Sequence, residues 1–242
     1  MKTENISDEI EHSRRIRYKA EAVWGWSTPA GRVRIARRIR LLKEAACLDS
    51  AKTVLELGCG TGVVSRGLSG FCRELVATEI SEELLSDAIA GPKKPNLHYL
   101  RCDAHKICFR DGAFDCVVGN SILHHLDMWE ALREVRRILR PGGRMAFAEP
   151  NMLNPQIVIQ KNIPLIKKLL GDSVHESAII RFRLEAQLKR LEFRDVKIIP
   201  FDFLHPYTPR FLIGAVSGTG AFLEKVPIVR EIAGSLLIAA ER

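Results

Sequence analysis

Residues 54–62 read VLELGCGTG, an apolar segment that runs directly into three glycines at every second position. Thr53–Leu57 has the β-branched, apolar composition of a buried strand, and Val63–Leu68 has the pattern of a helix. Glycine lets the chain turn sharply and lets a ligand approach the backbone, and a helix N-terminus attracts anionic groups. This strand–loop–helix unit therefore predicts a ligand site at the carboxyl end of an open parallel sheet.

Short apolar strands and helical patterns alternate through the middle of the chain. The predicted strands are Thr53–Leu57, Glu74–Thr78, Leu97–Leu100, Phe114–Gly119 and Arg144–Glu149. The predicted helices between them are Val63–Leu68, Ser81–Ala90 and Trp129–Leu139. Ser81 has the side chain of an N-cap, and Arg140-Pro141-Gly142-Gly143 is a typical helix stop. This alternation predicts βαβ units and a mostly parallel sheet.

Both ends of the chain depart from this rhythm. Two helices, Ser7–Trp24 and Pro29–Ala46, are expected before the first strand. After residue 149 we expect an apolar stretch interrupted by prolines (Pro150–Leu170), a helix (Glu176–Leu191), a strand (Val196–Phe201), an irregular segment (Phe203–Val229) and a final strand (Ser235–Ala240). There is no internal repeat or flexible linker, so the simplest expectation is a single domain over residues 1–242.

The composition is that of an ordinary globular protein, with 46% apolar and 27% charged residues among 242. No apolar run is long enough to span a membrane, and the polar start lacks the apolar segment of a secretory signal, so we expect a cytoplasmic protein. The six cysteines include no C-x-x-C pair. They are expected to be reduced and mostly buried, and no metal site is expected.

The net charge of +8 is concentrated near the N-terminus. Between Arg14 and Arg40, nine basic residues stand against one acid, Glu21, and the difference equals the whole excess. Such a cluster is compatible with nucleic acid, an anionic membrane surface, an anionic ligand or plain solubility. The stretch lacks an RNA-binding signature, which speaks against nucleic acid. The arginines from Arg32 to Arg40 recur at helical spacing and are expected to form a solvated helix face.

Acidic residues stand at or near the ends of three consecutive strands. The glycine pattern has Val63 where a dinucleotide fingerprint needs its last glycine, and Glu56 would face a pyrophosphate, so the loop suits a ligand with an ammonium group. Glu79 follows the middle glycine by 19 residues, where an acid can accept hydrogen bonds from ribose hydroxyls. Alternatively, Glu79 is only part of the cap of the helix that begins at Ser81. Asp103 is the third acid of the series.

The order of ELGCGTG, Glu79, CDA, FDCVVGNSILHHL and LRPGGRMAFAEPN resembles the class I S-adenosylmethionine-dependent methyltransferases. More narrowly, it resembles the methyltransferase type 11 group, small-molecule enzymes related to those of quinone biosynthesis, and it is specific over Val54–Asn151. The resemblance implies a Rossmann-like α/β fold with a seven-stranded, mostly parallel sheet, an antiparallel last strand and helices on both faces. The expected organisation is an N-terminal helical cap (1–50), a cofactor-binding half (51–150) and a substrate-side half (151–242).

The resemblance also implies the cofactor S-adenosylmethionine, with S-adenosylhomocysteine as its product. By analogy with the family, the glycine loop cradles the amino-acid part, Glu79 binds the ribose, and Asp103 with Ala104 binds the adenine. The cofactor-binding residues expected on this basis are Glu56, Gly58, Cys59, Gly60, Gly62, Glu79, Ile80, Asp103, Ala104 and Asn120.

Two adjacent histidines, His124 and His125, follow the fourth strand, which in this family is where the methyl group faces the acceptor. A histidine suits removal of a proton from an acceptor hydroxyl or ammonium because its pKa lies near neutrality. One is expected to face the pocket, and His124 is favoured because some family members place a working histidine after an Ile-Leu pair. A metal site is disfavoured because adjacent histidines are poor co-ligands. Cys59 and Cys116 are poorly placed for a nucleophile.

The two ends of the chain are expected to define the acceptor. Trp24 and Trp26 are expected either to close over the cofactor as a lid or to staple the helices to the sheet. Glu149 and Asn151 are expected to contact the acceptor. An apolar pocket wall or a plain helical cap is expected from the stretch Met152–Leu170, with Lys161, Lys167 and Lys168, together with Phe201–Phe222.

The favoured function is transfer of a methyl group to an oxygen or carbon atom of a small acceptor that is apolar, aromatic or lipid-like. The protein is expected to act as a monomer or a homodimer. Two alternatives remain open: a tRNA or rRNA methyltransferase, and a non-catalytic cofactor-fold binding module or peripheral membrane protein.

Overall fold

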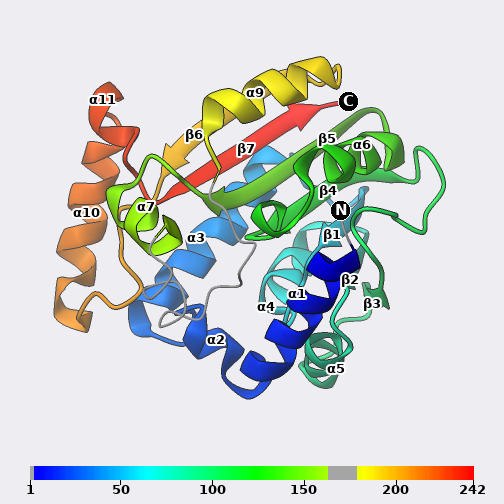
Figure 1. The fold of residues 1–242 in the computed structure, drawn as a ribbon, viewed down its shortest axis with the longest axis horizontal. Coiled ribbons are helices and arrows are strands. Elements are labelled where there is room, and N and C mark those ends of the chain that lie inside the picture. Colours follow the sequence, from blue (N-terminus) through cyan, green and yellow to red (C-terminus); the bar gives the residue numbers. More distant parts are fainter. Residues whose placement is uncertain (1–2, 163–178) are drawn as a thin grey trace.

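The computed structural model describes residues 3–162 and 179–242, with side chains for residues 10–159 and 179–242. In this part of the chain, seven strands form one sheet in the order β3-β2-β1-β4-β5-β7-β6 (Figure 1). The strands are β1 Thr53–Leu57, β2 Glu74–Glu79, β3 Leu97–Arg101, β4 Phe114–Asn120, β5 Leu139–Pro150, β6 Arg194–Phe201 and β7 Ser235–Glu241. β7 runs antiparallel to both of its neighbours and the other pairs are parallel, which confirms the expected topology.

Helices cover both faces of the sheet, as expected. Those described are α1 Thr3–Ile16, α2 Ala20–Val23, α3 Pro29–Ala45, α4 Val63–Leu68, α5 Glu82–Ala90, α6 Met128–Ile138, α7 Pro155–Asn162, α9 Arg181–Arg190, α10 Ile213–Leu223 and α11 Pro227–Arg230. One core cluster joins the sheet to α3, α4 and α5, and another joins it to α6 and α9. The sheet is therefore sandwiched between two helical layers (Figure 1).

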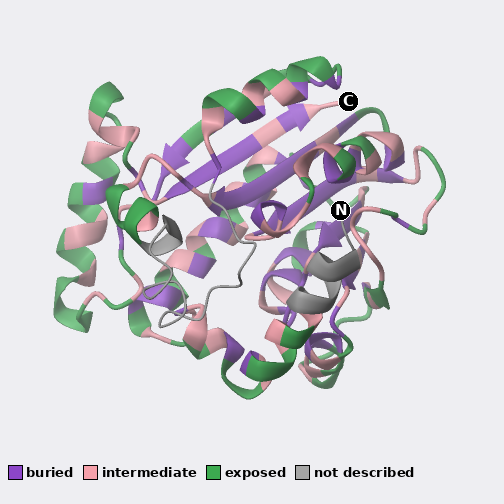
Figure 2. Cartoon of the chain, in the orientation of Figure 1, coloured by how far each residue is buried: buried purple, intermediate pink, exposed green. Residues whose placement is uncertain are grey.

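Strand β1 shows why the central strands read as continuous apolar runs. Val54 packs into the cluster that contains Leu42 of α3, whereas Leu55 packs into the cluster that contains Leu132 of α6. All four side chains are fully buried. Because a parallel strand between two helical layers is buried on both faces, neither face needs polar side chains (Figure 2).

The N-terminal cap is not one continuous helix up to Trp24. Helix α1 ends at Ile16, a 3-10 turn covers Arg17–Lys19, and α2 follows. Ile16 and Ala20, on either side of the turn, are both buried in one small apolar cluster with Leu84 of α5. The break thus lets both segments of the cap pack against α5.

The expectation of an irregular segment over Phe203–Val229 is wrong, because α10 and α11 form there. Helix α10 reads IGAVSGTGAFL, with no charged residue and several weak helix formers, so neither propensity nor an amphipathic pattern indicates it. It is held from its end: Glu224 binds Arg37 of α3 through two bonds of 2.8 and 2.5 Å. Glu224 also accepts the backbone N–H of Asp202 at 2.9 Å. Much of α10 is exposed at one edge of the molecule (Figure 2).

Two expectations are only partly covered by the structure. The helix expected over Glu176–Leu191 is observed as the shorter α9, which begins at Arg181 because Ile179 pairs with Asn151; residues 176–178 lie outside the described residues. Of the stretch Met152–Leu170, α7 is seen, whereas residues 163–170 and the side chains of Lys161, Lys167 and Lys168 lie outside the described part. Among the described residues, no helix is both long and apolar enough to cross a bilayer.

All six cysteines are free thiols, but fewer are buried than expected. Cys59, Cys72 and Cys116 are buried, whereas Cys47 and Cys108 are exposed.

A tight contact at the start of α3 leads to a stability prediction. A Cβ at Gly31 would lie 1.8 Å from the carbonyl oxygen of Gly25, in the loop that carries Trp26. A Gly-to-Ala change within a helix normally stabilises by about 1 kcal/mol. Here we expect Gly31→Ala to lower the free energy of unfolding by about 2 kcal/mol or more, because the backbone must move apart.

Urea titration measures this change. The matched control is Gly70→Ala, whose new Cβ would meet no atom within 4 Å. We expect the control to keep the stability of the parent protein. Equal stabilities of the two variants would contradict the close packing of α3 on the tryptophan loop.

Candidate active site

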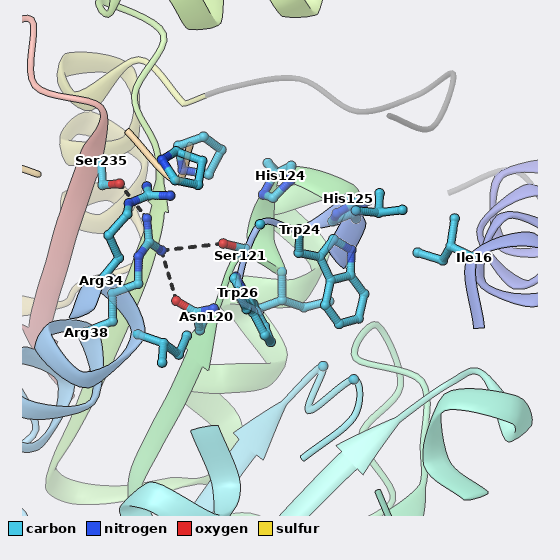
Figure 3. A pocket seen from close by; sticks show the side chains of 18 of the residues that line it. Ile16, Trp24, Trp26, Arg34, Arg38, Asn120, Ser121, His124, His125 and Ser235 are labelled. Carbon is cyan, nitrogen blue, oxygen red and sulfur yellow. Dashed lines mark hydrogen bonds between the residues drawn. The ribbon is translucent and has the colours of Figure 1, made fainter. Parts of the chain in front are cut away.

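A cavity of about 460 Å³ lies at the carboxyl ends of the central strands, under the N-terminal helices. The sheet contributes the glycine loop, the end of β2 and the segment after β4, and the cap contributes tryptophans and arginines (Figure 3). A smaller cavity of about 50 Å³ adjoins it. The two share Gly58, Glu79, Ile80, Ile122 and His125. One elongated ligand can therefore contact both.

The glycine loop needs glycine for two reasons. Gly58 and Gly60 have φ values of +64° and +54°, in the left-handed region that side chains disfavour. A Cβ at Gly58 would also lie 2.5 Å from Ile122, and one at Gly60 would lie 3.1 Å from the Trp24 ring. The loop thus keeps its backbone open to the cavity. Cys59 and Gly62 line neither cavity, and burial raises the pKa of the Cys59 thiol.

Glu79 joins the end of β2 to the glycine loop. Its Oε2 accepts the N–H of Gly60 at 2.9 Å, and its Oε1 accepts those of Ile80 and Ser81 at 2.8 and 3.0 Å. Burial raises the pKa of Glu79, although these amides act in the opposite direction. A carboxylate has about four acceptor positions, so one remains on Oε2, in a residue that lines both cavities. Helix α5 is capped by Ser81, whose Oγ accepts the N–H of Leu84, so Glu79 is not its side-chain cap.

Glu56 lies beneath the loop, away from both cavities. It is 1% exposed, and its Oε2 has no hydrogen-bond partner among the described residues. Burial raises the pKa of Glu56 to about 7, while the nearby Ser65 hydroxyl and Arg66 guanidinium oppose this rise.

The loop that follows β3 contains Asp103 and Ala104, which line the small cavity. Asp103 Oδ1 accepts the backbone N–H of His105 at 2.9 Å and lies 2.8 Å from His105 Nδ1. The N–H of Asp127 donates to His105 Nε2 at 3.0 Å, so the proton of a neutral ring lies on Nδ1. His105 was not expected from the sequence, because its role depends on a loop 22 residues away.

The adjacent histidines both line the large cavity, and His124 is held there by a carboxylate. His124 Nδ1 lies 2.7 Å from Glu149 Oε2, and both side chains are buried. Glu149 Oε1 accepts the N–H groups of Ile122 and Leu123 at 2.9 and 3.0 Å. Burial raises the pKa of Glu149, yet the bonds from His124 and the two amides outweigh it and leave this pKa below its usual range. Glu149 itself does not line the cavity.

The tryptophan loop closes the cavity from above. Trp24 and Trp26 line it, with their ring centroids 4.8 Å apart. The Trp24 ring lies so close to Gly60 that a Cβ there would be 3.1 Å from it. The hydroxyl of Thr61 in the glycine loop donates to Glu21 of α2 at 3.0 Å. The cap is therefore bonded directly to the loop that it covers.

Arg38 corrects the expectation of a fully solvated arginine face. Its Nη1 donates to Asn120 Oδ1 at 2.9 Å and its Nη2 to Ser235 Oγ at 2.5 Å. Burial lowers the pKa of Arg38 to about 10. The burial of Arg38 could have been predicted from helical periodicity. Arg38 follows Ile35 by three residues and precedes Leu42 by four, so all three lie on the buried face of α3.

Asn151 is used by the fold rather than exposed to the cavity. Its Nδ2 donates to the carbonyls of Glu231 and Ala233, both at 2.8 Å, and its Oδ1 accepts the N–H of Leu153. Further residues of the cavity wall are His12, Ser13, Arg34, Gln156, His205, Tyr207 and Ser235, of which Gln156, His205 and Tyr207 fall in the two stretches that were expected to form a pocket wall. Among the described side chains, no group of three or more His, Cys, Asp or Glu is placed to hold a metal ion.

Glu56 yields a prediction about pH. Its folded pKa of about 7 exceeds the ordinary 4.5, so between these values the folded protein keeps a proton that the unfolded chain has released. The stabilising contribution is therefore complete at low pH and is lost as pH rises toward and through 7, by up to about 3 kcal/mol. Relative to the parent protein, Glu56→Gln should gain stability between pH 5 and pH 8.

Urea titrations of both proteins at the two pH values give this difference. The control is Glu44→Gln, an exposed position on α3. The role assigned to burial fails when Glu56→Gln and the control show the same pH dependence.

The comparisons with known proteins agree with the fold and the motifs. The methyltransferase domain family of type 11 matches residues 55–147. A demethylmenaquinone methyltransferase of Lactococcus lactis is 30% identical over 140 residues, which cover 51% of this chain and 55% of that protein. Such matches span about half or less of the curated relatives' own length.

Solved structures show the same fold at low identity. The phosphoethanolamine N-methyltransferase 2 of Haemonchus contortus, in complex with S-adenosylmethionine, superimposes with a TM-score of 0.66 at 16% identity, covering 96% of this chain and 59% of that one. A methyltransferase of Haloferax volcanii, in complex with its activator Trm112, gives 0.63 at 18%, covering 90% and 95%. Residues 55–147 therefore form a methyltransferase domain of the type 11 family, within a fold that is also seen in S-adenosylmethionine-dependent methyltransferases.

Proposed function

We propose that this protein transfers a methyl group from S-adenosylmethionine to an oxygen or carbon atom of a small acceptor with an apolar or aromatic body. The observation that carries this proposal is the buried pair of His124 and Glu149. His124 of this pair lines the cavity that the glycine loop and Glu79 also line, and Glu149 holds it from behind.

The residues at the carboxyl ends of β1, β2 and β4 fit the cofactor. The left-handed glycines keep the loop open, and Glu79 retains one acceptor position toward the cavity. Asn120, at the end of β4, also lies in the cavity wall. When bound, S-adenosylmethionine supplies an electrophilic methyl group on a positively charged sulfur.

The work left to the protein is to orient the acceptor, exclude water and remove a proton. The carboxylate of Glu149 accepts a hydrogen bond from the Nδ1–H of His124. The lone pair of the neutral ring therefore lies on Nε2. Nε2 then takes the proton of an acceptor hydroxyl, and Glu149 stabilises the imidazolium that forms. Deprotonation of a phenol raises electron density on its oxygen and on ring carbons, so the same base serves either acceptor atom.

The cavity wall supports a small acceptor with an apolar body. Trp24, Trp26, Ile35, Ile122 and Ile157 contribute apolar surface to it. The similarity to a demethylmenaquinone methyltransferase, whose name specifies a small-molecule acceptor, points the same way.

The ion pairs of the basic cluster speak against the nucleic-acid alternative. The pairs are Arg14–Glu83, Arg17–Asp87, Arg34–Asp202 and Arg37–Glu224. Arginines that are committed to carboxylates within the protein release fewer counterions on contact with phosphates. The membrane alternative rested on Met152–Leu170, which lies in part outside the described residues, and it stays a prediction, as do the cytoplasmic location and the monomer or homodimer.

Cofactor binding can be tested without an acceptor. Calorimetry should detect S-adenosylhomocysteine binding to the parent protein, and its absence at millimolar ligand would sink the proposed function. Glu79→Ala should weaken binding by about 10- to 100-fold, because the ribose loses a charged acceptor. The control is Glu74→Ala at the opposite end of β2, which should bind like the parent. Equal affinities of the two variants would refute the ribose role.

The base can be tested once a panel of phenols, quinone precursors, sugars and lipids yields a methylated product. His124→Asn should lower kcat by about 10²- to 10⁴-fold while leaving S-adenosylhomocysteine affinity nearly unchanged. Glu149→Gln should lower kcat less and shift the pH profile, because a neutral amide stabilises imidazolium poorly. The control His98→Asn alters an exposed residue of β3. A fully active His124→Asn would exclude this histidine as the base.

A further inference from the structure

Arg34 and Arg38, one helical turn apart on α3, face the same cavity and share one carboxylate. Arg34 Nε donates to Asp202 Oδ2 at 2.8 Å, and Arg38 Nη2 lies 3.9 Å from the same oxygen. Asp202 is 3% exposed and has a φ of 77°, a strained conformation for a residue with a side chain. The fold therefore holds this carboxylate in place for the two arginines.

The direct partners of Arg38 are uncharged. Its guanidinium donates to the amide oxygen of Asn120 and to the hydroxyl of Ser235, with longer approaches of 3.5 Å to Ser121 Oγ and the carbonyl of Ala148. Even with a pKa of about 10, the group is charged at neutral pH. Among the described residues, the two cations share one carboxylate within 4 Å, Asp202, and the buried Glu149 acts on Arg38 without forming an ion pair with it. A buried charge without its own counterion is costly, so this wall favours an anionic ligand.

A second observation points to a ligand at the same place. Asn120 is 5% exposed, and its Oδ1 is used by Arg38, which directs its Nδ2 elsewhere. Nδ2 is buried and has no partner among the described residues, although Asn120 lines the cavity. Figure 3 shows Arg34, Arg38, Asn120 and Ser121 gathered on one side of the pocket, with Trp24 and Ile16 on the other. An amide donor and a cation placed together match the oxygens of a carboxylate.

We infer that the methyl acceptor is an apolar or aromatic acid, whose carboxylate is held by Arg38 and Arg34 while its body lies against the tryptophans. This inference rests on the proposed methyl transfer and names its class of substrate. It adds a subsite that neither the glycine loop nor the histidine pair provides.

The sheet order assigns this subsite to the acceptor rather than to the carboxylate of the cofactor. Gly58 follows β1 and Glu79 ends β2, whereas Ser235 opens β7 and Asp202 follows β6, on the other side of β4 and β5. Neighbouring strands lie about 4.8 Å apart, so β7 is roughly 14 Å from β1. The guanidinium of Arg38, which bridges β4 and β7, therefore lies toward the side of the sheet away from the ribose position.

The test measures binding of matched acids and amides to the full chain saturated with S-adenosylhomocysteine. The probes are benzoate and benzamide, phenylacetate and phenylacetamide, and octanoate and octanamide, with dissociation constants from calorimetry. The parent protein should bind at least one acid about 10-fold or more tightly than its amide, as expected for a charge-assisted contact. Arg38→Met should bring this ratio close to one, and Arg38→Lys should retain part of it.

Further variants keep the result interpretable. Arg34→Met removes the second cation at a less buried position, and it should also lower the ratio where Arg38→Met proves unstable in thermal unfolding. The matched control is Arg40→Met, an exposed arginine of the same helix, which should keep the parent ratio. No preference for an acid in any of the three pairs, or a preference that both arginine variants retain, overturns the inference.

A separate measurement tests whether the arginines bind the carboxylate of the acceptor or that of the cofactor. 5′-Methylthioadenosine lacks the amino-acid part of S-adenosylhomocysteine. Should Arg38→Met weaken S-adenosylhomocysteine about 10-fold or more, leave 5′-methylthioadenosine unchanged and preserve the acid preference, the arginine holds the cofactor and the inference is overturned. Failure of the parent protein to bind S-adenosylhomocysteine at all would instead refute the proposed function.

Discussion

Buried carboxylates that accept backbone N–H groups hold together the loops at the carboxyl end of the sheet. Glu79 fixes the glycine loop to the end of β2, and Glu149 fixes the turn after β4 to β5. Loops at this edge have no strand neighbours to satisfy their amides, so a charged acceptor compensates each loss. The same two side chains also present chemistry, since Glu79 lines both cavities and Glu149 orients His124. The geometry of these loops and the orientation of His124 therefore both depend on hydrogen bonds to buried carboxylates.

The fold, and the meeting of several predicted cofactor residues at one cavity, could be predicted because their signals are local. Val54 and Leu55 face opposite helical layers, which forces a continuous apolar strand. Strand ends in a parallel sheet meet at one edge, so Glu79 and Asn120 line a common cavity although they come from different strands. Sequence order was enough to place these groups together.

The part of the chain after β4 and the arginines of α3 depend on contacts between distant segments, which no local pattern encodes. Helix α10 lacks amphipathic periodicity and depends on Glu224 reaching Arg37. Asn151 was assigned to the acceptor from its position alone, whereas its amide binds carbonyls about 80 residues away. The arginines of α3 were expected to form a solvated face because they are charged. Their positions around the helix differ, however, and Arg38 lies on the buried face between Ile35 and Leu42.

The bond from Arg38 to Ser235 spans 197 residues of sequence, and this separation bears on how the protein is made. A ribosome releases the chain from its N-terminus, so helix α3 emerges long before β7 exists. Until then, the guanidinium that will be buried lacks its hydroxyl partner, and Arg34 lacks Asp202, which lies 168 residues later. The cofactor loop and β1–β4 can assemble during this interval, but the arginine wall cannot close. Synthesis thus imposes an order of assembly in which the part of the pocket proposed to hold the acceptor is completed after the glycine loop.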